Sequence, residues 1–91
     1  MNQITIEHNP SPMKLEAMYV DSWPIWSKEV STFEWTYDSK EMAYILEGEA
    51  VVTPRGGEPV TIKARDLVNF AKGLVCTWEI RTPLRKHYLT D

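Results

Sequence analysis

Apolar and polar residues alternate along most of the chain in short runs, and this period of two is typical of β-strands. The longest run covers residues 41–53 and is apolar at most positions, as expected for a buried strand. It contains Gly48, which marks a bulge or a bend within the strand. Shorter runs predict further strands at residues 3–7, 25–29, 30–37, 60–63, 67–70, 74–80 and 85–89.

Turn-forming residues separate these runs at the short intervals that are typical of β-sandwiches and barrels. The segment PRGGEP at residues 54–59 predicts a hairpin, because Gly56 and Gly57 adopt positive φ at little cost. Thr82 and Pro83 predict a break between the last two strands. The pattern therefore predicts an all-β fold.

The chain has 91 residues, enough for one domain with a modest core. Ser11 is suited to cap a helix and Pro12 to begin it, so a short helix is expected over residues 13–18. The predicted organisation is a single domain, with an N-terminal arm and short helix over residues 1–22 and a β-barrel over residues 23–89.

Charge and composition narrow the classes of function. The net charge is −3 and there is no large basic cluster, so we expect no binding to nucleic acid or to an acidic membrane. A single cysteine excludes an internal disulfide framework. The sequence shows neither a signal peptide nor an apolar segment of the ~20 residues that span a bilayer. Together these features predict a cytoplasmic protein.

Two motifs of the cupin family are present in part. The first, H-x-H-x(3,4)-E-x(6)-G, is matched at its end by Glu41 and Gly48. The second, G-x(5)-P-x-G-x(2)-H-x(3)-N, fits in spacing, although most of its letters differ. The wider segment over residues 23–88 resembles the small single-domain cupins grouped with the (S)-ureidoglycine aminohydrolases, which implies a jelly roll, or double-stranded β-helix barrel. At the five named positions of the second motif the chain has Arg65, Ala71, Gly73, Cys76 and Ile80.

The resemblance implies a metal centre that this sequence does not reproduce. Cupins use the motif histidines and glutamate to hold Mn, Fe, Ni or Zn, and the aminohydrolases use Glu, two His and Gln to hold Mn. Depending on the gap counted, the two first-motif histidine positions fall on Trp35 and Tyr37 or on Glu34 and Thr36. No histidine remains at any of them, so we expect no metal cofactor. The alternative is a Mn, Zn or Fe centre held by Glu41, Cys76 and Glu34.

The candidate site combines one carboxylate, one thiol and several aromatic rings. Glu41 is either a functional carboxylate at the mouth of the barrel or part of a structural hydrogen-bond network. If Trp35 and Tyr37 point inward, they face Glu41 and Cys76, and an aromatic box for a small planar or cationic molecule results. The alternative is that these rings simply fill the barrel. The predicted pocket residues are Glu41, Tyr37, Trp35, Cys76 and Trp78.

The remaining polar candidates are expected to be structural. Lys86 and His87 alternate on the last strand, so only one of them faces inward, and His87 is expected to be structural or on the surface. His8 is expected to be exposed to solvent. Arg65 stands where the family prefers Gly, which suggests a positive φ that costs a non-glycine residue about 1 kcal/mol. We expect the turn around Arg65 to adapt.

The sequence predicts a small-molecule-binding cupin of unassigned reaction without the usual His-based metal centre. One alternative is a metal-dependent enzyme that acts on a C–N bond, and another is a structural barrel with a filled core. The sequence leaves open whether the protein is an enzyme. The expected partner is a small organic molecule, and the resemblance together with residues 23–26 predicts a homodimer.

Overall fold

The computed structural model describes residues 3–91, which form seven strands, one α-helix and one turn of 3₁₀-helix. Six of the expected strands and the expected helix lie within one residue of their predicted bounds. No helix in this part of the chain has the length and apolar character needed to cross a bilayer. In chain order the elements are β1 (Ile4–His8), α1 (Pro12–Ala17), η1 (Val20–Ser22), β2 (Ile25–Lys28), β3 (Ser31–Thr36), β4 (Glu41–Pro54), β5 (Val60–Lys63), β6 (Asp66–Phe70) and β7 (Val75–Thr90).

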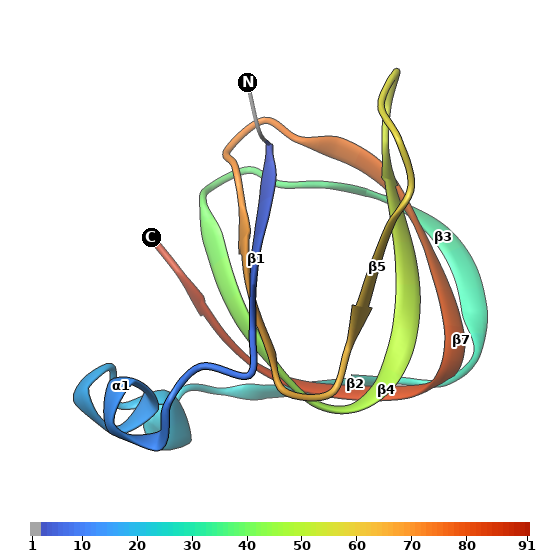
Figure 1. Ribbon diagram of the computed structural model, residues 1–91. Helices are drawn as coiled ribbons and strands as arrows, with labels where there is room; N and C mark the ends of the chain where they lie inside the picture. The colour runs from blue at the N-terminus through green and yellow to red at the C-terminus, as the bar shows by residue number, and fades with distance from the viewer. Residues whose placement is uncertain (1–2) are drawn as a thin grey trace.

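β4 and β7 are long enough to take part in two sheets, and they join these sheets into a barrel (Figure 1). In the first sheet, residues 41–45 of β4 pair with β6 and with the second half of β7, and the order is β1-β6-β4-β7-β2. In the second sheet, residues 49–54 of β4 pair with β5 and with the first half of β7, which also pairs with β3. Every pairing is antiparallel, and the predicted jelly-roll barrel is confirmed.

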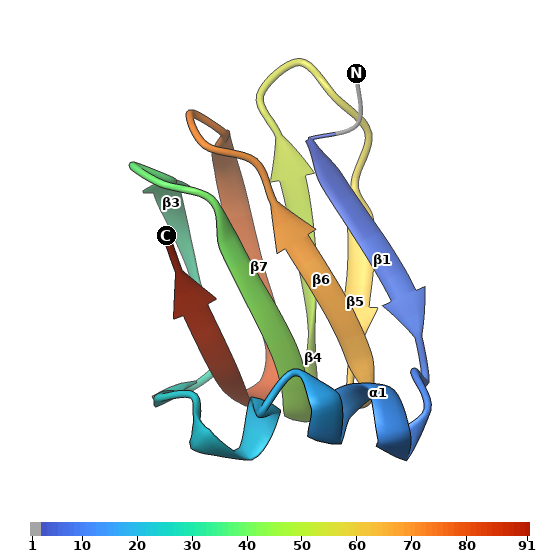
Figure 2. The same ribbon diagram turned by 90° about the vertical axis from the view of Figure 1, so that its left-hand side faces the viewer.

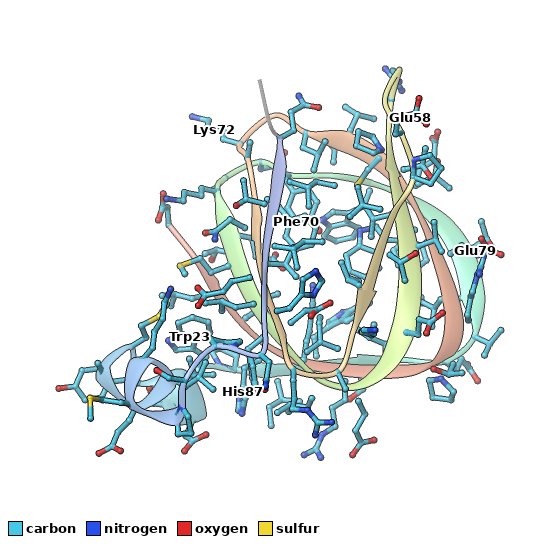
Figure 3. All side chains as sticks on the ribbon, in the orientation of Figure 1. Trp23, Glu58, Phe70, Lys72, Glu79 and His87 are labelled. Carbon is cyan, nitrogen blue, oxygen red and sulfur yellow. The ribbon has the colours of Figure 1, made fainter. Side chains whose placement is uncertain are left out.

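The main core lies inside the barrel, between the two sheets. Inward and outward side chains alternate along β7, where Cys76 and Trp78 are buried and Thr77 and Glu79 are exposed. Phe70 projects into the barrel, whereas Glu79 points away from it (Figure 3). The core is therefore built by the period-two pattern that the sequence shows.

A bulge at Gly48 lets β4 turn from one sheet into the other. The register of β4 against β7 shifts between Ile45 and Ala50, and Gly48 has φ +91°. A Cβ at Gly48 would lie 2.3 Å from the carbonyl oxygen of Pro83, so the backbone of β7 occupies the space of a side chain. Pro83 does not interrupt β7, because it lies opposite this irregularity, where its missing N–H costs no ladder hydrogen bond. The predicted bulge is confirmed, and the predicted break at Thr82 and Pro83 is wrong.

The α1 helix and the η1 turn lie outside the barrel, against the outer face of the first sheet (Figure 2). The helix begins as expected, because the Ser11 side chain accepts a hydrogen bond from the Lys14 backbone N–H at 3.1 Å. The first sheet is thus covered on both faces, which explains why β6 is buried at nearly every position. This second cluster comprises Val20, Trp23 and Leu67, with Leu15, Met18, Met42 and Tyr44 packed against it.

The turn before β6 keeps the strained conformation that the family reserves for glycine. Arg65 has φ 73°, and the expectation that the turn adapts is wrong. Two hydrogen bonds hold the residue there: its N–H donates to the Ile45 carbonyl at 2.8 Å, and its carbonyl accepts from the Asn9 N–H at 2.8 Å. The fixed tertiary partners therefore override the local preference of the arginine backbone.

Candidate functional site

A cavity of about 260 Å³ lies between the two sheets. The first sheet contributes lining residues from β2, β4 and the second half of β7, and the second sheet contributes residues from β3 and the first half of β7. Among the described residues, only Glu41 and Lys86 bring a charge to its wall. The rest of the wall is largely aromatic, namely Trp26, Phe33, Trp35, Tyr37, Trp78 and Tyr88.

Glu41 and Lys86 form an ion pair on this wall, with Lys86 Nζ 2.8 Å from Glu41 Oε2. Glu41 begins β4, and Lys86 lies on the neighbouring strand β7, where its Cα partner is Ile45. The side chains are only 10% and 8% exposed, respectively. Two charges so well shielded from water must compensate each other, because either one alone would be costly to bury.

Three aromatic rings also lie close to the Lys86 ammonium group. Lys86 Nζ lies 5.0 Å from the ring centroid of Trp26, 5.0 Å from that of Trp78 and 5.8 Å from that of Phe70. These distances are within the range of favourable cation–π contacts. The ammonium group is therefore held by one carboxylate and three rings.

The orientation of β3 decides which of two residue sets belongs to the site. Phe33 and Trp35 are the Cα partners of Trp78 and Cys76, and they share the inward face of the sheet with them. Tyr37 follows β3 and is buried in the main core. Trp35 and Tyr37 thus line the cavity, which agrees with the interpretation in which these two residues point inward. The other pair, Glu34 and Thr36, lies on the exposed outer face.

Tyr37 is a neutral hydrogen-bonding group in this site. Burial raises the pKa of its phenol strongly, and the negative charge of the nearby Glu41 carboxylate raises it further. The ring is fixed by stacking on Phe70, with centroids 4.7 Å apart, and by an edge contact with Trp35. Tyr37 therefore presents a protonated hydroxyl at any physiological pH.

Residues 15–88 match the sequence model of a protein family, the EutQ-like cupin domain. The chain belongs to this family. A DUF861 family protein from Thermotoga maritima is 49% identical to this cupin, with a TM-score of 0.94 over 97% of this chain and 99% of that one. No curated protein matches the sequence.

Two less similar structures share the cupin fold. A putative ethanolamine utilization protein Q from Salmonella typhimurium is 29% identical, with a TM-score of 0.66 over 72% of this chain and 53% of that chain. A predicted oxalate decarboxylase from Thermotoga maritima is 24% identical, with a TM-score of 0.57, and shows the shared fold alone. The family and the jelly-roll fold are thus established, while the reaction is unassigned.

The residues of this cupin do not fit the metal centre that the cupin motifs imply. Within residues 3–91, no three His, Cys, Asp or Glu side chains gather closely enough to hold a metal ion. Of the three alternative ligands, Glu34 lies on the outer face of the sheet. Cys76, on the paired strand β7, lies on the inward face of the same sheet. Glu41 is already paired with the Lys86 ammonium. The three alternative ligands therefore do not converge.

Cys76 is the one predicted pocket residue that the structure does not place on the wall of this cavity. It is 3% exposed, lies in the main core, and its thiol donates a weak hydrogen bond to the Trp35 carbonyl at 3.7 Å. Burial raises the pKa of the thiol from its usual 9.0 to about 11. The group is therefore a buried thiol rather than a thiolate ligand.

This raised pKa predicts that stability falls in alkaline solution. The unfolded thiol loses its proton near pH 9.0 and the folded one near pH 11, so the folded chain binds more protons between these values. The contribution of Cys76 is complete below pH 9.0 and is lost as the pH rises toward 11. Urea unfolding at several pH values is expected to show a smaller alkaline loss for Cys76→Ala than for the wild type. Equal losses would contradict the assignment.

Reasoning from the sequence missed Lys86, which completes the charged pair. The alternation of the last strand contained the signal, because Leu84 is apolar and Lys86 lies two positions after it, on the same inward face. His87 lies on the opposite face, where its Nδ1 is 2.8 Å from the carbonyl oxygen of Trp23 (Figure 3). The other lining residues that the sequence candidates left out are Trp26, Phe33, Tyr88 and Thr90.

Proposed function

We propose that this cupin binds a small organic molecule in the aromatic cavity between its sheets. The observation that carries the proposal is the Glu41–Lys86 ion pair buried on the wall of a cavity of about 260 Å³. This volume lies near the lower end of the range of about 300–1,000 Å³ that is usual for small-molecule pockets. A few polar groups on a mostly aromatic wall are the usual composition of a small-molecule site.

The polar groups of the cavity favour a molecule with both hydrogen-bond donors and acceptors. Lys86 donates to Glu41 through one of its three N–H groups, which leaves two for other acceptors. Glu41 is an acceptor and Tyr37 carries a neutral hydroxyl. Because Glu41 and Lys86 compensate each other, the wall as a whole is uncharged, which favours a ligand whose own net charge is zero.

The two alternative functions have weaker support. A metal-dependent enzyme acting on a C–N bond, similar to ureidoglycine aminohydrolase, needs several metal donors, and Glu41 is paired with Lys86 instead. A structural barrel with a filled core is expected to leave no cavity, whereas Trp35 and Trp78 line one. The predicted homodimer and cytoplasmic location stay predictions.

The proposal is tested by thermal unfolding of the protein in a panel of metabolites that includes ureides and amino acids. A bound molecule is expected to raise the midpoint, and calorimetric titration then gives its dissociation constant. Trp35→Ala is the informative variant, because this side chain lies at the cavity yet is 48% exposed, so its loss disturbs the core little. We expect the dissociation constant to increase about tenfold or more.

Tyr19→Ala is the matched control for this test, since Tyr19 is an aromatic residue exposed to solvent and absent from the cavity wall. It is expected to bind like the wild type. A panel without any stabilising molecule, or equal binding by the two variants, would count against the proposed site.

A further inference from the structure

The Lys86 ammonium lies beside Glu41, the residue that stands at the glutamate of the cupin metal-binding motif. Glu41 is the motif residue, and its Oε2 lies 2.8 Å from Lys86 Nζ. The ammonium is buried, since the lysine side chain is only 8% exposed. We infer that Lys86 is a built-in cation, which takes the place of a free metal ion at Glu41 and makes the cavity independent of divalent metals.

The surroundings of Lys86 Nζ suit an organic ammonium ion and not a metal ion. Three ring faces, those of Trp26, Trp78 and Phe70, lie 5.0–5.8 Å from the nitrogen. A combination of aromatic faces and one carboxylate is the arrangement by which proteins hold ammonium groups. The faces of these rings offer no lone pairs, whereas a structural zinc ion needs four donor atoms and calcium six to eight. The site therefore selects for the cation that the chain itself supplies.

The neighbouring candidate ligands do not change this conclusion. Cys76 is buried in the core, and its thiol hydrogen-bonds to the Trp35 carbonyl. Glu34 is exposed on the outer face of β3. Among the residues that line the cavity, a divalent ion at Glu41 would therefore find one carboxylate, and it would have to displace the ammonium group. The inference concerns the resident cation alone, so it holds whichever molecule the cavity binds.

The wild-type protein provides the first test. Titration of the full chain with Mn²⁺ and with Zn²⁺, together with elemental analysis of protein purified without chelator, is expected to show no stoichiometric metal. Of the six lysines, Lys86 is the buried one, so its ammonium protons are expected to exchange slowly and to give a separate ¹H–¹⁵N signal. One metal ion per chain, or no protected lysine signal, would overturn the inference.

The second test asks whether the site recognises an ammonium ion that is no longer attached to the chain. Lys86→Ala removes four heavy atoms, and propylammonium has the same four. We expect propylammonium to raise the unfolding midpoint of Lys86→Ala in a saturable manner, by at least about 4 °C. The wild type, whose own lysine fills the site, is expected to show no such shift.

Two controls separate charge recognition from the filling of space. Propanol has the shape of propylammonium without its charge, and it is expected to give less than about a quarter of the shift. The double variant Glu41→Gln with Lys86→Ala keeps the space but loses the carboxylate, and is expected to lose the rescue. Equal rescue by propanol, or rescue that persists in the double variant, would overturn the inference. If Lys86→Ala does not fold, the wild-type metal titration and lysine signal still decide the question.

Discussion

Replacing Lys86 by Met is expected to lower the free energy of unfolding by about 3–5 kcal/mol, because it leaves the Glu41 carboxylate buried without its partner. Glu41→Met is expected to have a similar effect, since it leaves the Lys86 ammonium buried among aromatic rings without its carboxylate partner. Both side chains are at most 10% exposed, so water compensates neither charge. The loss of unfolding free energy in these two single variants is one of the two largest that we expect for any change in this protein.

A double variant shows whether the cost arises from the broken pair. With both residues changed to Met, no charge remains in the cavity and the volume is nearly kept, so we expect a loss far below the sum of the two single losses. Urea unfolding curves of the four proteins measure this coupling. Glu7 and Lys14 give the matched control, because they form an ion pair with side chains 46% exposed, and breaking it is expected to cost about 1 kcal/mol or less. Additive losses at Glu41 and Lys86 would contradict a coupled pair.

Gly48→Ala is expected to destabilise the barrel by at least about 3 kcal/mol, through both backbone strain and steric overlap. The residue has φ +91°, which an L side chain rarely adopts. Its Cβ would lie 2.3 Å from the Pro83 carbonyl oxygen and 2.9 Å from the Leu84 Cα. These contacts, and a third at 2.9 Å to the Pro83 carbonyl carbon, are all to backbone atoms of β7, so neither strand can relax without breaking the ladder at the bend.

Gly73→Ala separates the two causes. Gly73 has a similar φ of +87°, but a Cβ there would meet no heavy atom within 4 Å. Gly73→Ala is therefore expected to lower the free energy of unfolding by about 1 kcal/mol, through backbone strain alone. The comparison is made by thermal and urea unfolding of both variants, and equal losses would show that the contact between Gly48 and Pro83 is unimportant.

The bend at Gly48 also has a functional consequence, because it determines how the cavity is assembled. Glu41 belongs to the part of β4 in the first sheet, whereas Trp35 and Trp78 reach the cavity from the second sheet. The two sheets face each other only because β4 and β7 pass from one into the other. A variant that straightens β4 is therefore expected to lose the binding site together with stability.

Local patterns in the sequence determined most of the fold. The alternation of apolar and polar residues located six strands within one residue, and Ser11 with Pro12 located the start of the helix. Gly48 and its distance from Glu41 indicated the bulge and the family. These features are readable because strand period, helix caps and positive φ depend on neighbouring residues alone.

Only the tertiary structure decided the composition of the site. Two interpretations of β3 were equally compatible with its alternation, and the pairing of Trp35 with Cys76 selected one of them. The continuity of β7 through Pro83 depended on the bulge in the opposite strand. The role of Lys86 depended on Glu41, which is far away in the sequence and 2.8 Å away in space. Period two tells which side chains share a face, but the packing of one sheet on another decides which face is inside and what a buried charge meets there.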